Sequence, residues 1–231
     1  MKLTKIQLEN IEELSSQVYT AIDYEYNKYF DESDEFDRDD DSFTADMYEV
    51  GDQDTSDYHW EMMAGASKIC FVCEELPFVV KFPVPTQYVF NSETGESKDY
   101  CEKEYEVYQI AKNSPYKKMF AQIKKIETKS GAVYVQPKIE NNGLYAPKTA
   151  VSRDNQLDDL NSPLRHIDKI KYLAGASYAF WEYMSVRYGF VFACNFSRFC
   201  RRANVNDLHG GNYKFDDNNL CIFDYSGFFF G

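Results

Sequence analysis

Hydrophobic residues near the start of the chain recur at helical spacing. Over residues 4–22 they follow one another three or four positions apart, after a threonine: Leu8, Ile11, Leu14, Val18 and Ile22 after Thr4. Residues at this spacing share one side of a helix, and a threonine hydroxyl can accept a bond from a first-turn amide. The pattern predicts an amphipathic helix capped by Thr4.

From residue 58 the pattern changes to short β-branched and aromatic runs separated by turns of hairpin length, which is typical of antiparallel strands. The elements predicted over this stretch are strands at 58–63, 67–73, 77–82, 120–127 and 132–136 and a helix at 99–111. The remaining predictions are an irregular linker at 141–164, a long helix at 165–188 closed by Gly189, a basic helix at 196–202 and a hairpin at 213–223. The chain is therefore predicted to be an α+β protein.

Composition points to a soluble globular chain. Hydrophobic residues make up 44% and charged residues 27% of 231 positions, which argues against general disorder. No apolar run reaches the roughly 18 residues that a membrane crossing needs. The first residues lack the apolar core of a secretory signal. These features predict a cytoplasmic protein without a membrane partner.

The net charge of −13 is concentrated in one segment. Residues 23–61 hold 16 acidic residues against Lys28 and Arg38, whereas the rest of the chain has 22 acidic and 23 basic residues. No basic stripe is present, so nucleic acid is not expected as a ligand. The acidic segment is interpreted as a solubilising loop, as a docking site for a basic protein, or as an autoinhibitory flap.

The six cysteines are predicted to be free thiols. Cys70 and Cys73 form a C-x-x-C motif, but it lies in a predicted strand, where residues three apart point to opposite faces. Neither a second cysteine pair nor a nearby histidine completes a zinc site.

The strongest chemical signal lies near the end of the sequence. Asp207 and Asn212 are the ends of D-L-H-G-G-N, and Asp224 follows an apolar strand 12 residues later. Phosphoryl transfer from a nucleotide uses one carboxylate near the accepting hydroxyl, with an amide oxygen and a second carboxylate on magnesium. The spacing is typical of a kinase catalytic loop and metal-binding triplet.

A second signal lies upstream. Lys81 stands in an apolar strand, V-V-K-F, and kinases place a phosphate-contacting lysine in such a strand. A glutamate on the following helix must pair with it. Glu104 fits best, with Glu102 and Glu106 as alternatives.

Together these motifs resemble the protein-kinase-like phosphotransferases, over about residues 58–228. The D-L-H-x-G-N form is similar to aminoglycoside and choline phosphotransferase-like kinases and to small phage-encoded protein kinases. The resemblance implies a bilobal fold: an N-terminal helix plus acidic segment (1–56), a kinase-like N-lobe with a Glu-bearing helix (57–140) and a short, mostly helical C-lobe (141–231).

The resemblance also implies ATP and Mg²⁺ as cofactors. Lys81 would contact the nucleotide phosphates and Glu104 would orient Lys81. Asp207 would be the catalytic acceptor of the substrate hydroxyl proton, and Asn212 and Asp224 would hold magnesium. Residues 133–139 would lie beside the adenine, with Gln136 and Lys138 as nucleotide-binding residues.

The chain departs from the family at several positions. The glycine loop keeps only Gly65. Ser67 and Lys68 are candidates to replace its phosphate contacts, although a surface position is the expectation for Lys68. Val205 stands where the family has histidine, and Asp224-Tyr225-Ser226 replaces D-F-G. Seven residues follow Asp224, so the activation segment and later helices of large kinases are expected to be absent.

Other conspicuous residues are given ordinary roles. His209 is expected to bond the loop backbone, and Trp60 and Trp181 are expected in the core. Three arginines precede the catalytic motif and suit either a phosphate or the acidic segment: Arg198, Arg201 and Arg202.

Three functions follow from these observations. The first is a small protein Ser/Thr kinase, in the host cytoplasm if the source is viral, which would bind a nucleotide and a protein substrate. A small-molecule kinase is the second. The third is a pseudokinase or binding module that presents the acidic segment to a basic protein partner.

Overall fold

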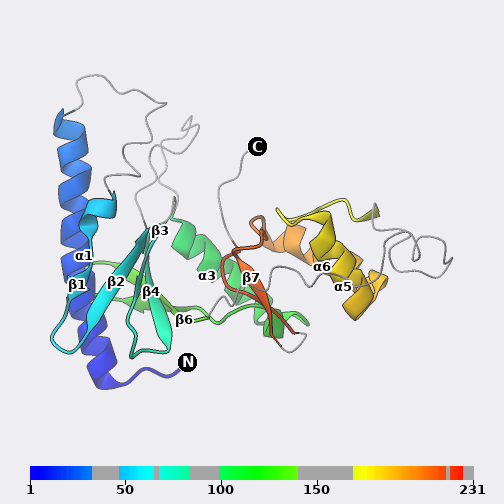
Figure 1. Ribbon diagram of the computed structural model, residues 1–231, viewed down its shortest axis with the longest axis horizontal. Coiled ribbons are helices and arrows are strands. Elements are labelled where there is room, and N and C mark those ends of the chain that lie inside the picture. The colour runs from blue at the N-terminus through cyan, green and yellow to red at the C-terminus, as the bar shows by residue number, and fades with distance from the viewer. Residues whose placement is uncertain (33–46, 65–67, 84–98, 140–168, 217–218, 226–231) are drawn as a thin grey trace. The chain divides into compact units, whose positions relative to one another are not determined.

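The computed structural model describes residues 1–32, 47–64, 68–83, 99–139, 169–216 and 219–225 (Figure 1). The protein is α+β, as predicted, and divides into two compact units. Unit 1 comprises Met1–Tyr105 and Gln122–Lys138, and unit 2 comprises Glu106–Ala121 and Ile139–Gly231. Each unit is described separately.

The described part of unit 1 is built on an antiparallel sheet of six strands in the order β1-β2-β3-β4-β6-β5. Its elements are α1 (Lys5–Glu32), η1 (Met47–Val50), β1 (Gln53–Asp54), β2 (His59–Ala64), β3 (Lys68–Val72), β4 (Phe78–Pro83), β5 (Lys124–Glu127), β6 (Ala132–Pro137) and the start of α3 (Tyr100–Ala111). Four predicted strands and the helix at 99–111 are confirmed to within one residue. The strand predicted at 120–127 begins only at Lys124.

One face of this sheet is apolar and is covered by α1 (Figure 1). Ile69 pairs with Phe82 across β3 and β4, and Val80 pairs with Val135 across β4 and β6. All four side chains are fully buried in the same hydrophobic cluster as the apolar stripe of α1, which consists of Ile11, Leu14, Val18 and Ile22. Burial of this stripe, rather than helix propensity, holds α1 in place.

The N-terminal helix is confirmed with two differences. The hydroxyl of Thr4 accepts a bond from the Gln7 amide at 3.2 Å, as expected of a cap. The helix runs to Glu32, beyond the predicted end at residue 22, because its polar second half has no breaker before that point. Leu8, expected in the stripe, is 39% exposed.

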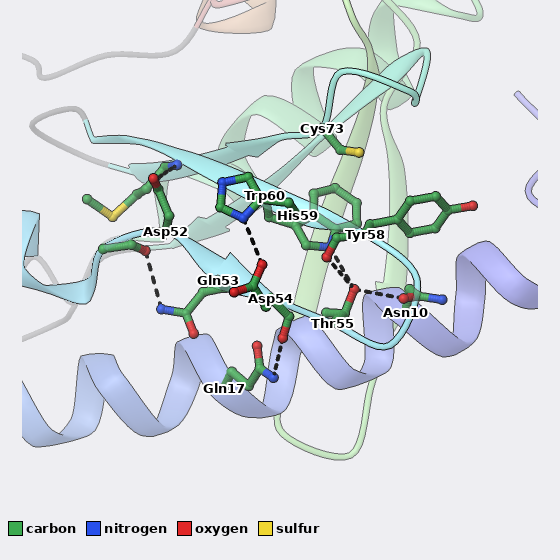
Figure 2. Close-up of polar contacts among 12 residues, drawn as sticks. Asn10, Gln17, Asp52, Gln53, Asp54, Thr55, Tyr58, His59, Trp60 and Cys73 are labelled. Carbon is green, nitrogen blue, oxygen red and sulfur yellow. Dashed lines mark hydrogen bonds and ion pairs between the residues drawn. The ribbon is translucent and has the colours of Figure 1, made fainter.

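A buried asparagine ties α1 to the turn between β1 and β2 (Figure 2). Asn10 is 2% exposed. Its Oδ1 accepts bonds from the Thr55 hydroxyl at 2.7 Å and the Asp57 amide at 3.1 Å, and its Nδ2 donates to the Asp57 carboxylate at 2.7 Å. Thr55 in turn accepts a bond from the indole of the buried Trp60 at 3.1 Å.

Replacement of Asn10 by alanine is expected to destabilise unit 1 by about 1–3 kcal/mol, because it removes the hydrogen bonds by which this buried side chain holds Thr55 and Asp57 of the turn. The midpoint of urea unfolding measures this change. Glu9→Ala is the matched control, since it removes only the exposed Lys5–Glu9 pair on the same helix and should shift stability by less than about 0.5 kcal/mol. Equal effects of the two substitutions would contradict the role assigned to Asn10.

Unit 2 has an aromatic core. Its described elements are the remainder of α3, η2 (Lys117–Met119), α5 (Tyr178–Tyr188), α6 (Phe190–Ala203), β7 (Tyr213–Asp216) and β8 (Asn219–Ile222). Trp181 and Phe196 are fully buried, with ring centroids 6.0 Å apart. The predicted core positions of Trp60 and Trp181 and the predicted C-terminal hairpin are confirmed, and the basic helix is part of the longer α6.

The single long helix predicted at 165–188 is wrong. Within the described residues the helix begins at Tyr178, where the Ser177 hydroxyl accepts a bond from the Phe180 amide. The chain before it turns through Ala174 and Gly175, whose φ angles are 53° and 77°. These left-handed conformations interrupt the helix. Gly189 closes α5 as predicted. The predicted linker at 141–164 lies outside the described residues.

None of the helices in the described part of the chain combines the length and apolar character that a bilayer crossing needs.

Candidate functional site

The second face of the unit 1 sheet carries polar side chains. Cys70 pairs with Lys81 across β3 and β4, and Lys81 pairs with Tyr134 across β4 and β6. Paired residues project to the same side of a sheet, and neighbours along a strand project to opposite sides. Lys81 and Tyr134 therefore lie opposite the apolar Val80 and Val135. The apolar face of the sheet thus lies toward α1. The opposite face, which carries Cys70, Lys81 and Tyr134 and is called the chemical face below, lies toward the start of α3.

The predicted contact between Lys81 and Glu104 is present. Asp99 caps α3 by accepting a bond from the Glu102 amide at 2.8 Å, which starts the helix in the phase that turns Glu104 inward. Nζ of Lys81 lies 3.0 Å from Oε2 of Glu104, and the two side chains are 5% and 1% exposed. The alternative Glu102 instead pairs with Lys125 at 2.8 Å, and Glu106 is exposed.

Lys68 is not the surface residue that the sequence suggested. It is 6% exposed, and its Nζ lies 2.7 Å from the other oxygen of Glu104, Oε1. Lys68 stands two residues before Cys70 on β3 and therefore projects to the same face as Lys81. A buried counter-ion at a distant position overrides the ordinary preference of lysine for the surface.

A buried thiol lies beside these charges. Burial raises the pKa of Cys101 well above its ordinary value, while the ammonium group of Lys68 acts in the opposite direction. The thiol is therefore neutral near pH 7 and contributes no negative charge. All six cysteines are free, as predicted.

Gln136 is a second notable residue on this face. It is 2% exposed, and its Nε2 is a buried donor that has no hydrogen-bond partner within the described residues. Such a donor is costly unless a ligand or an ordered water supplies an acceptor. Lys138 is exposed, and its backbone amide donates to the Pro77 carbonyl at 2.9 Å. The predicted nucleotide contacts Gly65 and Ser67 lie outside the described residues.

In unit 2, the catalytic-loop motif folds as a tight turn that connects its two ends. Nδ2 of Asn212 donates to the backbone carbonyl of Asp207 at 2.8 Å, and the Asn212 amide donates to the His209 carbonyl at 2.9 Å. Leu208 is fully buried and anchors the turn. The Asp207 side chain is 32% exposed, which leaves its carboxylate accessible.

The C-terminal hairpin brings Asn212 next to Asp224. Tyr213 pairs with Ile222, and the carbonyl of Asn212 accepts bonds from the amides of Phe223 at 3.0 Å and Asp224 at 3.3 Å. Two predicted magnesium ligands thus lie at the open end of one hairpin.

The chemistry of these donors suits magnesium. Nδ2 of Asn212 is bonded to Asp207, so the amide oxygen is the atom this side chain can offer to a metal, beside the carboxylate of Asp224. Magnesium on a nucleotide takes few protein oxygens and completes its octahedron with phosphate oxygens and water. Within the described residues, no group of three or more His, Cys, Asp and Glu side chains is arranged to hold a metal ion.

The segment before α5 supports the loop at residues 207–212, and sequence reasoning missed it. The Leu208 amide donates to the Ala174 carbonyl at 2.8 Å, and the Tyr172 hydroxyl donates to the Val205 carbonyl at 2.7 Å. A Cβ on Gly175 would lie 2.6 Å from the carbonyl oxygen of Asn206. The only sequence signal for this turn was a glycine between two alanines, and it was not recognised because it lies within the helix predicted at 165–188.

Gly175→Ala is expected to reduce any phosphotransfer turnover by about 10- to 100-fold, because the new methyl group must displace the backbone next to Asp207. The strained φ angle should also cost about 1–3 kcal/mol of stability. Gly189→Ala is the matched control, since Gly189 also has a positive φ, of 91°, but a Cβ there meets nothing within 4 Å. Steady-state turnover of the two variants checks the prediction, and equal turnover would contradict it.

His209 bonds the loop backbone as predicted. Its Nδ1 accepts a bond from the Gly211 amide at 3.2 Å, and its Nε2 lies 3.6 Å from Oδ1 of Asp207. The three arginines are exposed on α6, where Arg198 donates to Asn195 and Arg202 donates to the Arg198 carbonyl.

Comparison of the chain with protein-family models, curated proteins and solved structures finds no match.

Proposed function

We propose that this protein is an ATP- and magnesium-dependent phosphotransferase of bilobal, protein-kinase-like architecture that acts on protein serine or threonine. The observation that carries the proposal is the buried Lys81–Glu104 ion pair, at 3.0 Å. The sequence analysis predicted this pair, because a kinase needs a strand lysine and a glutamate on the next helix. The two residues are 23 positions apart and lie on different elements. Burying such a pair is costly, so it is weak evidence for a purely structural role.

On the chemical face of unit 1, Lys81 binds phosphate oxygens as a point charge and Glu104 holds its ammonium group in place. The buried Nε2 of Gln136, two positions beyond Tyr134 on β6, offers a donor to an acceptor atom of the adenine ring. An amide in a dry site discriminates strongly between bases that can and cannot accept its bond.

In unit 2, Asp207 accepts the proton of the attacking hydroxyl, and its partly exposed carboxylate leaves room for a substrate. Asn212 and Asp224 hold the metal through one amide and one carboxylate oxygen. Bound magnesium neutralises charge on the phosphates during transfer. Hydrogen bonds from the Asn212 side chain to the Asp207 carbonyl and from the Asp224 amide to the Asn212 carbonyl hold neighbouring residues together before any ligand binds, which lowers the cost of reaching the reactive geometry.

The acidic segment favours a basic protein as the acceptor. Residues 23–61 hold 16 acidic side chains against two basic ones, and complementary charge speeds encounter with a basic partner.

Incubation of the full chain with γ-labelled ATP and magnesium tests the proposal. Label is expected on a serine or threonine of the protein itself or of a basic protein substrate, and Lys81→Met should abolish it. Lys125→Met is the matched control, because it removes a more exposed lysine–glutamate pair made by the same helix. ATP binding without transfer would favour a binding module, and transfer to small hydroxyl compounds alone would favour a small-molecule kinase. If the protein neither binds ATP nor transfers the labelled phosphate, the proposal is refuted.

A further inference from the structure

A cavity of about 440 Å³ opens on the surface of unit 2. It lies between the last turn of α3, the residues just before η2 and one side of α6. Its lining is mostly apolar and consists of Ile110, Pro115, Tyr116, Asn195, Phe199, Arg202 and Ala203. All seven residues belong to unit 2, and none lies in the loop at residues 207–212 or in the C-terminal hairpin. The cavity is therefore separate from the site described above.

One wall of the cavity is fixed before any ligand binds. The ring of Tyr116 packs against three phenylalanines of α6. Its centroid lies 4.9 Å from that of Phe199, 5.1 Å from that of Phe196 and 5.5 Å from that of Phe192. Phe199 and Ala203, which line the cavity beside this ring, are 9% and 2% exposed. A ligand at this wall does not bear the entropic cost of ordering it.

Ile110 stands at the opening of the cavity. It is 50% exposed although its side chain is aliphatic. Single exposed aliphatic residues are common on protein surfaces, but this one adjoins the apolar walls of a cavity. An apolar side chain that enters the cavity removes Ile110 and those walls from water, which favours binding.

Two arginines lie beside the cavity. Arg202 lines it, and its Nε donates to the Arg198 carbonyl at 3.3 Å. Nη1 of Arg198 in turn donates to the side chain of Asn195, another lining residue, at 3.3 Å. Both arginines are exposed, and within the described part of the chain neither forms an ion pair with a carboxylate. Their other N–H groups are available to an anionic ligand.

Positive charge extends over both segments that line the cavity. Residues 106–121 and 190–203 contain three lysines and three arginines against one acid, Glu106, whereas the whole chain has a net charge of −13. This charge is complementary to an acidic ligand. Six basic side chains exceed what one small carboxylate would use, so they suit a ligand with several acidic groups.

The cavity is open rather than enclosed. Four of its seven lining residues are exposed, namely Ile110, Pro115, Asn195 and Arg202. Small molecules bind in clefts that bury most of their surface, whereas a peptide needs cover chiefly for the side chain that anchors it. The open shape therefore favours a peptide segment over a small molecule.

We propose that this cavity is a docking site for an acidic segment of a partner protein. The segment inserts one aromatic side chain between Ile110 and Phe199 and places carboxylates on Arg198 and Arg202. This inference does not rest on the proposed phosphotransferase function. Its partner also carries the charge opposite to that of the basic acceptor proposed above.

Fluorescence anisotropy tests the inference, with the full chain titrated into a labelled synthetic peptide in which one phenylalanine lies among glutamates and aspartates. The wild type is expected to bind this peptide, and to bind a version with serine in place of phenylalanine at least about tenfold more weakly. Arg202→Gln and Ile110→Ser should each raise the dissociation constant about fivefold or more.

Two matched controls lie on α6 outside the cavity lining. Arg201→Gln makes the same change of charge one residue earlier, and Val191→Ser removes an aliphatic side chain that is 73% exposed. Both should stay within about twofold of the wild type. All four substituted residues are exposed, so the midpoints of urea unfolding should stay close to that of the wild type.

The outcomes separate this docking site from its alternatives. The inference is refuted if the wild type does not bind the peptide, or if Arg202→Gln or Ile110→Ser binds it as tightly as its control does. Binding of phenylpropionate as tight as that of the peptide would indicate a small-molecule site and overturn the docking proposal. Self-association of the wild type that Arg202→Gln abolishes would assign the cavity to the acidic segment of a second copy and would also overturn it. The labelled-ATP assay tests the phosphotransferase proposal independently of all these results.

Discussion

Replacing Lys68 and Lys81 together with methionine is expected to lower the stability of unit 1 by about 3–5 kcal/mol, because the buried carboxylate of Glu104 then loses both lysines at once. Each single replacement should cost less than about 1 kcal/mol, since one lysine remains on Glu104. The structure therefore predicts strong non-additivity between two positions that lie 13 residues apart in the sequence but share one partner.

The tryptophans allow this prediction to be measured in unit 1 alone. The chain has two, Trp60 in unit 1 and Trp181 in unit 2, and both are fully buried. In a Trp181→Phe background, fluorescence during urea unfolding reports the surroundings of Trp60. Adding Glu104→Gln to the double variant should recover part of the loss, because it removes the buried charge. Additive effects of the two lysine substitutions, with no recovery by Glu104→Gln, would contradict the shared ion pair.

Asp207→Asn is expected to reduce phosphotransfer by about 10²- to 10⁴-fold, because an amide cannot accept the proton of the attacking hydroxyl. The substitution keeps the shape of the side chain. The bond that positions Asn212 goes to the backbone carbonyl of Asp207, and Leu208 anchors the loop through its own amide. The loop should therefore keep its structure, and ATP affinity should stay close to that of the wild type.

Single-turnover kinetics with labelled ATP, beside an equilibrium titration, separate chemistry from binding in this variant. Glu182→Gln on α5 is the matched control: it makes the same carboxylate-to-amide change elsewhere in unit 2 and should leave the rate unchanged. Full activity of Asp207→Asn would exclude Asp207 as the proton acceptor. A loss of ATP affinity as large as the loss of rate would instead indicate a binding role.

Most elements of unit 1 could be predicted from the sequence, because each is indicated either by a short run of neighbouring residues or by the chemical requirements of a kinase motif. Short β-branched and aromatic runs between turns of hairpin length located β2, β3 and β4, and these strands bury apolar side chains in the cluster that also contains the stripe of α1. Glu104 was identified among three candidates because a strand lysine in a kinase needs a glutamate on the next helix, and the helix has the phase that turns it inward. The adjacency of Asn212 and Asp224 followed from the hairpin predicted at 213–223, which lies between them.

The predictions failed where a distant partner decides the outcome. Nothing near Lys68 in the sequence indicates burial, because its counter-ion lies 36 residues away. The turn at Gly175 was missed because Leu173 to Ala176 is compatible with a helix, and the reason for the turn is contact with the backbone at Asn206 and Leu208. Gln136 was selected by its place in the motif, but only the fold reveals that its Nε2 is a buried donor.

The central claim is that this protein binds a nucleotide together with magnesium. Titration of ATP with and without magnesium into the wild type, Lys81→Met and Asp224→Asn tests this claim most directly. The account predicts that the wild type binds ATP more tightly when magnesium is present. It also predicts that Lys81→Met weakens binding about tenfold or more in both conditions, and that Asp224→Asn removes the gain from magnesium. A wild type that binds no ATP, or ATP affinities that are equal in all three proteins, would contradict it.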